Sequence, residues 1–139
     1  MLPRNYRTRG SSTIKTKTLK RVLLGHVGVD SGQIMISDPC YVKDFNDNED
    51  FDPARVDERG NYPYSYNGSC GATLSDAMGG QLGVIHGVVS STGYGDGCYE
   101  VWATIGDSAG WGTRVHKLEV IFIDDSIDED EDEDDDNSY

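Results

Sequence analysis

Apolar and polar residues alternate along several segments of the chain, and this period of two predicts β-strands. The segments are residues 21–29, 33–37, 81–92, 98–105 and 113–123. They are rich in Val, Ile, Tyr and Trp, whereas the residues between them are rich in Gly, Asp and Ser, which favour turns. Helical periodicity is scarce, and one short helix is expected around residues 53–58. We therefore predict a mostly β fold, in which a single antiparallel meander forms a small barrel or a curled sheet.

Residues 93–97, with the sequence Gly-Tyr-Gly-Asp-Gly, are the strongest turn signal in the chain. Three glycines can adopt positive φ angles at little cost, and strand-like segments flank them on both sides. We predict that this stretch is the tip of a hairpin that pairs residues 81–92 with residues 98–105. A second hairpin loop is predicted over residues 106–112, and a turn over residues 76–80.

The strand predicted at residues 33–37 ends at Asp38-Pro39. Proline cannot donate a backbone hydrogen bond, and it restricts the residue before it. The period of two places Asp38 on the same side as Ile34 and Ile36, which we predict to be the inner side. A carboxylate beside a buried face needs a polar partner, so Asp38 is a candidate functional acid.

Residues 41–63 are acidic and poor in apolar residues, which indicates a solvated excursion from the sheet. The carboxylates suggest calcium, but a loop that starts at Asp44 has no Gly at its sixth position and no Glu at its twelfth, so it is not an EF-hand. Tyr62, Tyr64 and Tyr66 alternate, and in an extended segment their rings would share one side. They could stack on a ligand or simply cap the sheet.

Charge divides the chain into three parts: a flexible basic arm over residues 1–20, a β domain over residues 21–123, and a disordered acidic tail over residues 124–139. Residues 1–21 hold seven of the twelve basic residues and no acid, whereas residues 124–139 hold eleven of the twenty-five acidic residues and no base. The arm could bind nucleic acid, but the net charge of −13 would repel phosphates, so we expect no nucleic-acid partner. The tail could occupy a basic protein surface, make a loose contact with the basic arm of the same chain, or only keep the protein in solution.

No apolar segment is long enough for a signal peptide or a membrane span, and we expect no membrane association. The three cysteines, Cys40, Cys70 and Cys98, are irregularly spaced, which argues against disulfides and for the reducing cytoplasm. Together with His86 they offer the ligand types of a zinc site but not its paired spacing. We therefore expect neither a metal nor another cofactor.

The sequence contains no Gly-x-Ser-x-Gly elbow, no Cys-x-x-Cys and no P-loop. His86 and His116 are expected within strands, where a histidine more often makes a structural hydrogen bond than acts as a base. Asp96 could cap its own glycine-rich turn, or free N–H groups around it could bind an anion. These features do not decide whether the protein is an enzyme, but they favour a protein without enzymatic activity.

Two motifs, Asp-Pro-x-Tyr at residues 38–41 and Gly-Asp-Gly-x-Tyr at residues 95–99, resemble those of small uncharacterised bacteriophage proteins. A bacterial domain family of unknown function shares both elements. The similarity covers roughly residues 22–123 and implies a compact β domain of phage origin, with no activity to carry over. The positions that match the shared pattern are Asp38, Pro39, Tyr41, Gly95, Asp96, Gly97 and Tyr99.

We therefore predict a non-enzymatic binding protein, a phage accessory or anti-defence factor that binds a host protein or a small ligand in the host cytoplasm. The alternative is a small hydrolase, metal-assisted or acid/base, that uses Asp38, Asp96 and a histidine. No catalytic residue and no metal ligand is assigned. The predicted ligand-binding residues are Asp38, Tyr41, Tyr64, Gly95, Asp96, Gly97 and Tyr99.

Overall fold

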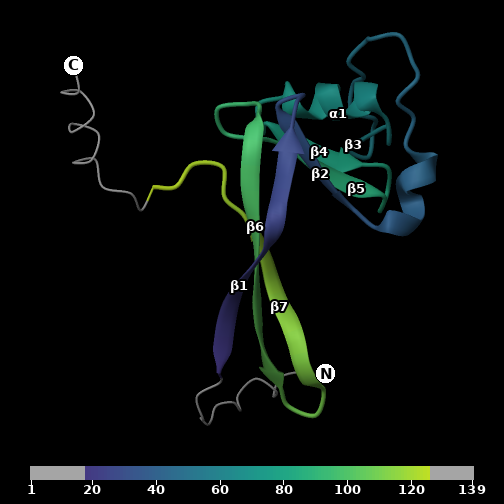
Figure 1. The fold of residues 1–139 in the computed structure, drawn as a ribbon. Helices are drawn as coiled ribbons and strands as arrows, with labels where there is room; N and C mark the ends of the chain where they lie inside the picture. Colours follow the sequence, from purple (N-terminus) through teal and green to yellow (C-terminus); the bar gives the residue numbers. More distant parts are fainter. Residues whose placement is uncertain (1–17, 126–139) are drawn as a thin grey trace, which may run out of the picture. The chain divides into compact units, whose positions relative to one another are not determined.

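The structure is a computed structural model, and it describes residues 18–125 of the 139. These residues form seven strands, one 3-10 helix and one α-helix, so the prediction of a mostly β fold is confirmed (Figure 1). Most of the predicted flexible arm and disordered tail lies outside the described residues. In chain order the elements are β1 (Leu19–Val29), β2 (Gln33–Ser37), η3 (Pro39–Asp44), β3 (Asn61–Tyr62), α1 (Tyr66–Thr73), β4 (Gly79–Leu82), β5 (Gly87–Ser91), β6 (Gly97–Ser108) and β7 (Gly112–Val120).

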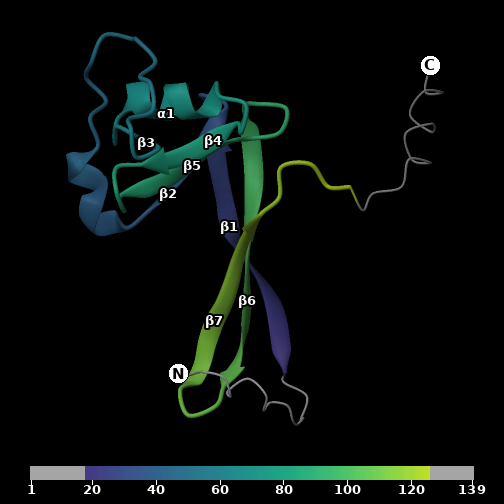
Figure 2. The same ribbon diagram turned by 180° about the vertical axis from the view of Figure 1, so that it is seen from behind.

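The strands form two sheets, so the prediction of a single meander is wrong. One sheet has the strand order β1-β6-β7, and the other has the order β2-β5-β4-β3, with α1 on one of its faces (Figure 2). The β3–β4 pair is parallel, whereas the β2–β5, β4–β5 and β6–β7 pairs are antiparallel. Neither sheet closes into a barrel within residues 18–125. The described chain divides into two compact units, residues 18–27 with 100–121 and residues 28–99 with 122–125.

The predicted hairpin around residues 93–97 is wrong. The strand expected over residues 81–92 is broken after Leu82, where Gly83 adopts a φ of 64°, and β4 and β5 form a hairpin there instead. His86 lies in that turn and not within a strand. Because β5 pairs with β4 on one edge and with β2 on the other, it has no free edge for β6. Residues 93–96 therefore connect strands that belong to different sheets.

The core of the four-stranded sheet shows that the predicted inner face of β2 is also wrong. Ala72 of α1, Leu82 of β4 and Val89 of β5 form the buried cluster, and Met35 packs against it. Met35 is paired with Val89, and side chains of paired residues share a face of the sheet. The pleat therefore turns Ile36 outward, and its side chain is 60 % exposed.

The hairpin predicted over residues 106–112 is confirmed, with a tighter turn than expected between Ser108 and Gly112. The register shifts between Thr104 and Ile105, and this β-bulge leaves His116 of β7 without a paired residue. The Nε2 atom of His116 lies 3.2 Å from the carbonyl oxygen of Gly106 on the neighbouring strand. Strand β7 ends at residue 120, three residues earlier than predicted.

The sequence does not predict helix α1, because residues 66–73 contain two glycines and no apolar period. Its start is nevertheless encoded by Ser65, whose hydroxyl accepts a hydrogen bond of 2.9 Å from the N–H of Gly68. The helix expected around residues 53–58 is absent, and residues 52–57 have no regular secondary structure.

Candidate functional site

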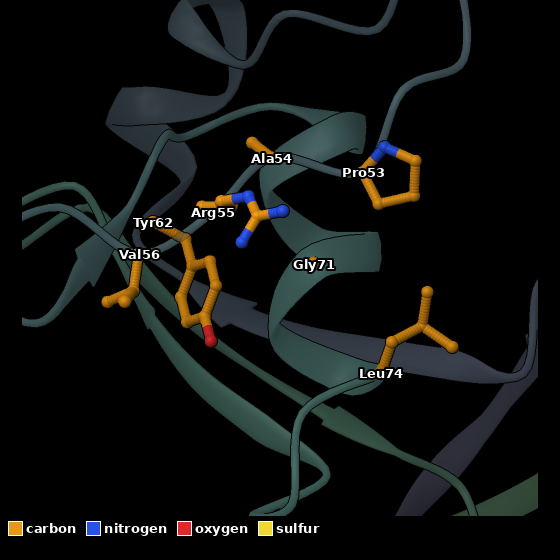
Figure 3. Close-up of a pocket in the computed structure, with 7 residues that line it drawn as sticks. All are labelled: Pro53, Ala54, Arg55, Val56, Tyr62, Gly71 and Leu74. Carbon is orange, nitrogen blue, oxygen red and sulfur yellow. The ribbon is translucent and has the colours of Figure 1, made fainter.

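A hollow of about 490 Å³ opens beside helix α1 (Figure 3). This volume lies within the range of roughly 300–1,000 Å³ that is common for small-ligand sites. In Figure 3 the guanidinium of Arg55 points toward the middle of the hollow, with the ring of Tyr62 beside it. The residues that line the hollow are Pro53, Ala54, Arg55, Val56, Tyr62, Gly71 and Leu74.

A second hollow of about 220 Å³ continues past Arg55 and Tyr62, which line both parts. We name the two hollows together the Arg55 groove. Its second part is lined by residues of the turn before β3, of β3 itself and the residue after it, and of the β4–β5 turn. They are Asp57, Asn61, Pro63, Gly83 and Val84, together with the two shared residues.

Residues 53–56 line one side of the larger hollow and are named the groove wall. Asn67, a buried residue of α1, holds the chain segment that leads into this wall. Its Nδ2 donates hydrogen bonds to Oε1 of Glu49 (2.8 Å) and to the carbonyl oxygen of Asp50 (2.9 Å). Its Oδ1 accepts a hydrogen bond of 3.0 Å from the N–H of Asp52. The Asn67 side chain thus satisfies the carbonyl of Asp50 and the N–H of Asp52, which lie outside any strand or helix.

Two glycines allow α1 to approach its neighbours closely. A Cβ atom on Gly71 would overlap the carbonyl oxygen of Ala54, and one on Gly68 would overlap that of Pro63. The N–H of Ala54 also donates a hydrogen bond of 2.9 Å to the carbonyl oxygen of Asn67. Glycine costs about 1 kcal/mol relative to alanine within a helix, so close packing, and not helix propensity, explains these residues. The two glycines lower the helix propensity of α1, which makes the helix hard to predict, and they also allow the groove wall to pack closely against it.

Asp57 closes the turn at the end of the groove wall. Its Oδ1 accepts hydrogen bonds from the N–H groups of Arg59 (2.8 Å) and Asn61 (2.9 Å). These backbone hydrogen bonds, the one from Asn61 first, hold the pKa of Asp57 below its ordinary value. The turn thereby positions Asn61 and Tyr62 of β3 at the side of the groove.

This turn is expected to lose stability in acid. Folding lowers the pKa of Asp57 below its ordinary value of 3.8, so the stabilisation is present above that pH and is lost as the pH falls through the folded-state pKa. An NMR titration of the Asp57 carboxyl should give a midpoint below the ordinary value. Asp57→Asn keeps an oxygen acceptor without the charge, and it should remove this part of the pH dependence while the turn persists. A midpoint at or above the ordinary value would contradict the expectation.

The Arg55 groove presents one cation among exposed apolar side chains. Leu74 is 73 % exposed, and Val56 and Val84 are also exposed. Among residues 18–125, Arg55 has no ion pair or hydrogen-bond partner for its side chain. A guanidinium binds a carboxylate through two parallel hydrogen bonds. The groove therefore suits a ligand that carries an acidic group between apolar groups.

Two of the residues predicted as a binding site, Tyr41 and Tyr64, pack against His86. Their ring centres lie 4.8 Å and 5.0 Å from that of the imidazole. The hydroxyl of Tyr64 lies 2.8 Å from Oγ of Ser37, which donates a hydrogen bond of 2.7 Å to the carbonyl oxygen of His86. The Nδ1 atom of His86 is buried and has no hydrogen-bond partner in the described chain. These contacts give both tyrosines a structural role.

Tyr99 holds together the connection between β5 and β6. Its hydroxyl donates hydrogen bonds to the carbonyl oxygens of Gly95 (2.6 Å) and Thr92 (3.1 Å). The hydroxyl of Thr92 donates to Gly95 as well (2.8 Å), and Gly95 has a φ of 115°, which favours glycine. The Tyr99 ring meets that of Phe122 edge to face at 5.3 Å. Asp96 is exposed at this connection.

Asp38 does not lie beside a buried face, so that interpretation is wrong. It is exposed, and its Oδ1 accepts a hydrogen bond of 2.8 Å from the N–H of Cys40 at the start of the 3-10 helix. Gly97 is the first residue of β6. Within the part of the chain that the structure describes, no three His, Cys, Asp or Glu side chains gather to hold a metal ion.

None of the seven predicted ligand-binding residues lines the Arg55 groove. The alternating tyrosines are the one sequence signal that leads to it, because Tyr62 lines both of its parts. Tyr62 and Tyr64 both pack against the buried cluster of Ala72, Leu82 and Val89, whereas Tyr66 departs from the expected extended segment because it begins helix α1. Arg55 and Leu74 carry no sequence signal at all.

Comparisons with protein-family models, with curated proteins and with solved structures found no match to this chain. Among the described residues, no helix is both long and apolar enough to span a membrane.

Proposed function

We propose that this chain is a non-enzymatic binding protein of bacteriophage origin, and that it binds an extended segment of a host protein in the Arg55 groove. The observation that carries the proposal is the guanidinium of Arg55, which has no partner among residues 18–125 and lies at a hollow of about 490 Å³ whose lining includes the exposed side chains of Val56 and Leu74. The two sequence motifs that resemble phage proteins support the origin.

The chemistry of the groove defines the segment that would bind. A carboxylate of the segment would pair with Arg55, because the charge-assisted hydrogen bonds of a guanidinium are about twice as strong as neutral ones. Apolar side chains before and after that carboxylate would cover Leu74 in the larger part and Val84 in the smaller part. An extended backbone can span both parts, since they meet at Arg55 and Tyr62.

Selection from a library of short displayed peptides tests this proposal. The full chain is expected to enrich peptides with an Asp or Glu flanked by apolar residues. Arg55→Ala should weaken the binding of the enriched peptides at least about tenfold, since hydrogen bonds to a charged group contribute roughly 1.5–3 kcal/mol. Arg59→Ala is the matched control, because Arg59 is an exposed arginine that does not line the groove, and it should bind as the wild type does.

Enrichment of basic peptides, or equal binding by the wild type and Arg55→Ala, would disprove this use of the groove. The alternative of a hydrolase built on Asp38 and Asp96 receives no support from the contacts of these residues. Asp38 caps a 3-10 helix, and Asp96 is exposed at the connection between β5 and β6.

A further inference from the structure

The two parts of the Arg55 groove differ in polarity. The larger part is lined by a single charged side chain, that of Arg55. The smaller part shares Arg55 and adds the carboxylate of Asp57 and the amide of Asn61. The groove therefore runs from an apolar end, past a cation, to an end that carries a carboxylate.

Arg55 and Asp57 lie close together, but they do not neutralise each other. Both line the smaller part, and one residue separates them in the chain, so their Cα atoms are at most about 7 Å apart. The one ion pair among residues 18–125 joins Arg21 to Glu119. Both charges of the groove are therefore available to a ligand.

The carboxylate of Asp57 is held in position by one of its two oxygens. The N–H groups of Arg59 and Asn61 both donate to Oδ1, and neither bond uses Oδ2. These bonds lower the pKa of Asp57, so the carboxyl is ionised at neutral pH. Each carboxylate oxygen accepts more than one hydrogen bond. Asp57 can therefore close its turn and bind a ligand at the same time.

We infer that the Arg55 groove is specific for a segment in which an acidic and a basic residue are separated by one residue. The acidic residue pairs with Arg55, and the basic residue lies beside Asp57. In an extended segment such residues point to the same side and are about 7 Å apart, which matches the spacing of Arg55 and Asp57. Apolar residues on the other side of the acidic residue cover the larger part. This inference rests on the proposed function, because it assumes that a peptide segment occupies the groove.

Asp57 contributes more to specificity than to affinity. Its side chain is exposed, and an exposed ion pair changes an affinity by a factor of up to about five. A basic residue beside Asp57 gains this factor, whereas an acidic residue at the same place is repelled. Asp57 thereby fixes which residue of the segment meets Arg55, since only one acidic residue is favoured in the groove.

A double-mutant cycle between protein and peptide tests the inference. The peptide that the full chain enriches most is synthesised with Lys, Ala or Glu two residues from its acidic residue, and binding is measured by fluorescence anisotropy. The wild type is expected to bind the Lys peptide about two- to fivefold more tightly than the Ala peptide, and the Glu peptide more weakly than either. Asp57→Asn keeps the oxygen that accepts the turn hydrogen bonds, and it should bind the Lys and Ala peptides equally. Glu58→Gln is the matched control, because it removes the same charge from a neighbouring residue that does not line the groove, and it should keep the preference for Lys.

Equal binding of the Lys and Ala peptides by the wild type would overturn the inference and leave the proposed function intact, because the acidic residue would still be selected. A preference for Lys that disappears in Glu58→Gln would also overturn it, since the net negative charge of the chain would then explain the preference. Selected peptides without an acidic residue would instead contradict the proposed function itself. If Asp57→Asn does not fold, as circular dichroism shows, the three peptides on the wild type and on Glu58→Gln still decide.

Discussion

Asn67→Ala is expected to lower the free energy of unfolding by about 3 kcal/mol. The substitution removes three side-chain hydrogen bonds to residues 49–52, and each contributes roughly 1 kcal/mol. The groove wall should detach from α1, because the segment that leads into it has no other regular pairing. Urea unfolding followed by circular dichroism measures the loss of stability, and the peptides selected by the wild type should bind more weakly.

Asn46→Ala is the matched control for this experiment. Asn46 also hydrogen-bonds to Glu49 through its amide, and it accepts from the N–H of Asn48, but these bonds are exposed to water. Exposed hydrogen bonds are replaced by water at little cost, so the control should lose less than about 1 kcal/mol. Equal losses for the two variants would show that burial of Asn67 does not hold the wall.

Gly71→Ala is expected to destabilise the protein by about 2 kcal/mol, although alanine is the better helix former. The new methyl group would overlap the carbonyl oxygen of Ala54, and backbone cannot move aside by changing a rotamer. Overpacking of this kind costs roughly 1–3 kcal/mol and should exceed the gain in helix propensity of about 1 kcal/mol. Hydrogen exchange should show faster opening at Ala54, whose N–H is bonded to α1.

Gly28→Ala provides the same chemical change without the overlap. A Cβ atom on Gly28 of β1 would meet nothing within 4 Å, and this glycine does not have a positive φ. The control should therefore match the wild type or be slightly more stable, because alanine restricts the unfolded chain. Unchanged stability of Gly71→Ala would mean that the wall and the helix can separate at no cost.

The strands were predictable where alternation and a turn signal agree. Residues 33–37 satisfy both, since Asp38-Pro39 stops the strand, and β2 has the predicted bounds. Residues 81–92 show the alternation but have no recognisable turn signal inside them, and the structure nevertheless makes a tight turn at Gly83. A glycine within such a run can continue the strand or bend the chain into a turn, and the tertiary contacts determine which of the two occurs. The assignment of the glycine-rich stretch to a hairpin failed as a consequence.

The Arg55 groove could not be predicted from local sequence patterns, for a different reason. Its wall has no period, and its position depends on Asn67, which lies more than ten residues away along the chain. The helix beside it is stable through packing, although its two glycines lower its propensity. Tyr62 alone was indicated, because alternating tyrosines are conspicuous in any sequence.

The β-bulge at His116 affects how this chain would behave at high concentration. In the described sheet β7 is an edge strand, and a flat, regular edge can recruit further strands into fibrils. The bulge interrupts the regular row of N–H and C=O groups, and it increases the local twist. Irregular edges of this kind are how natural β proteins resist amyloid-like growth, so a variant without the bulge should aggregate sooner than the wild type.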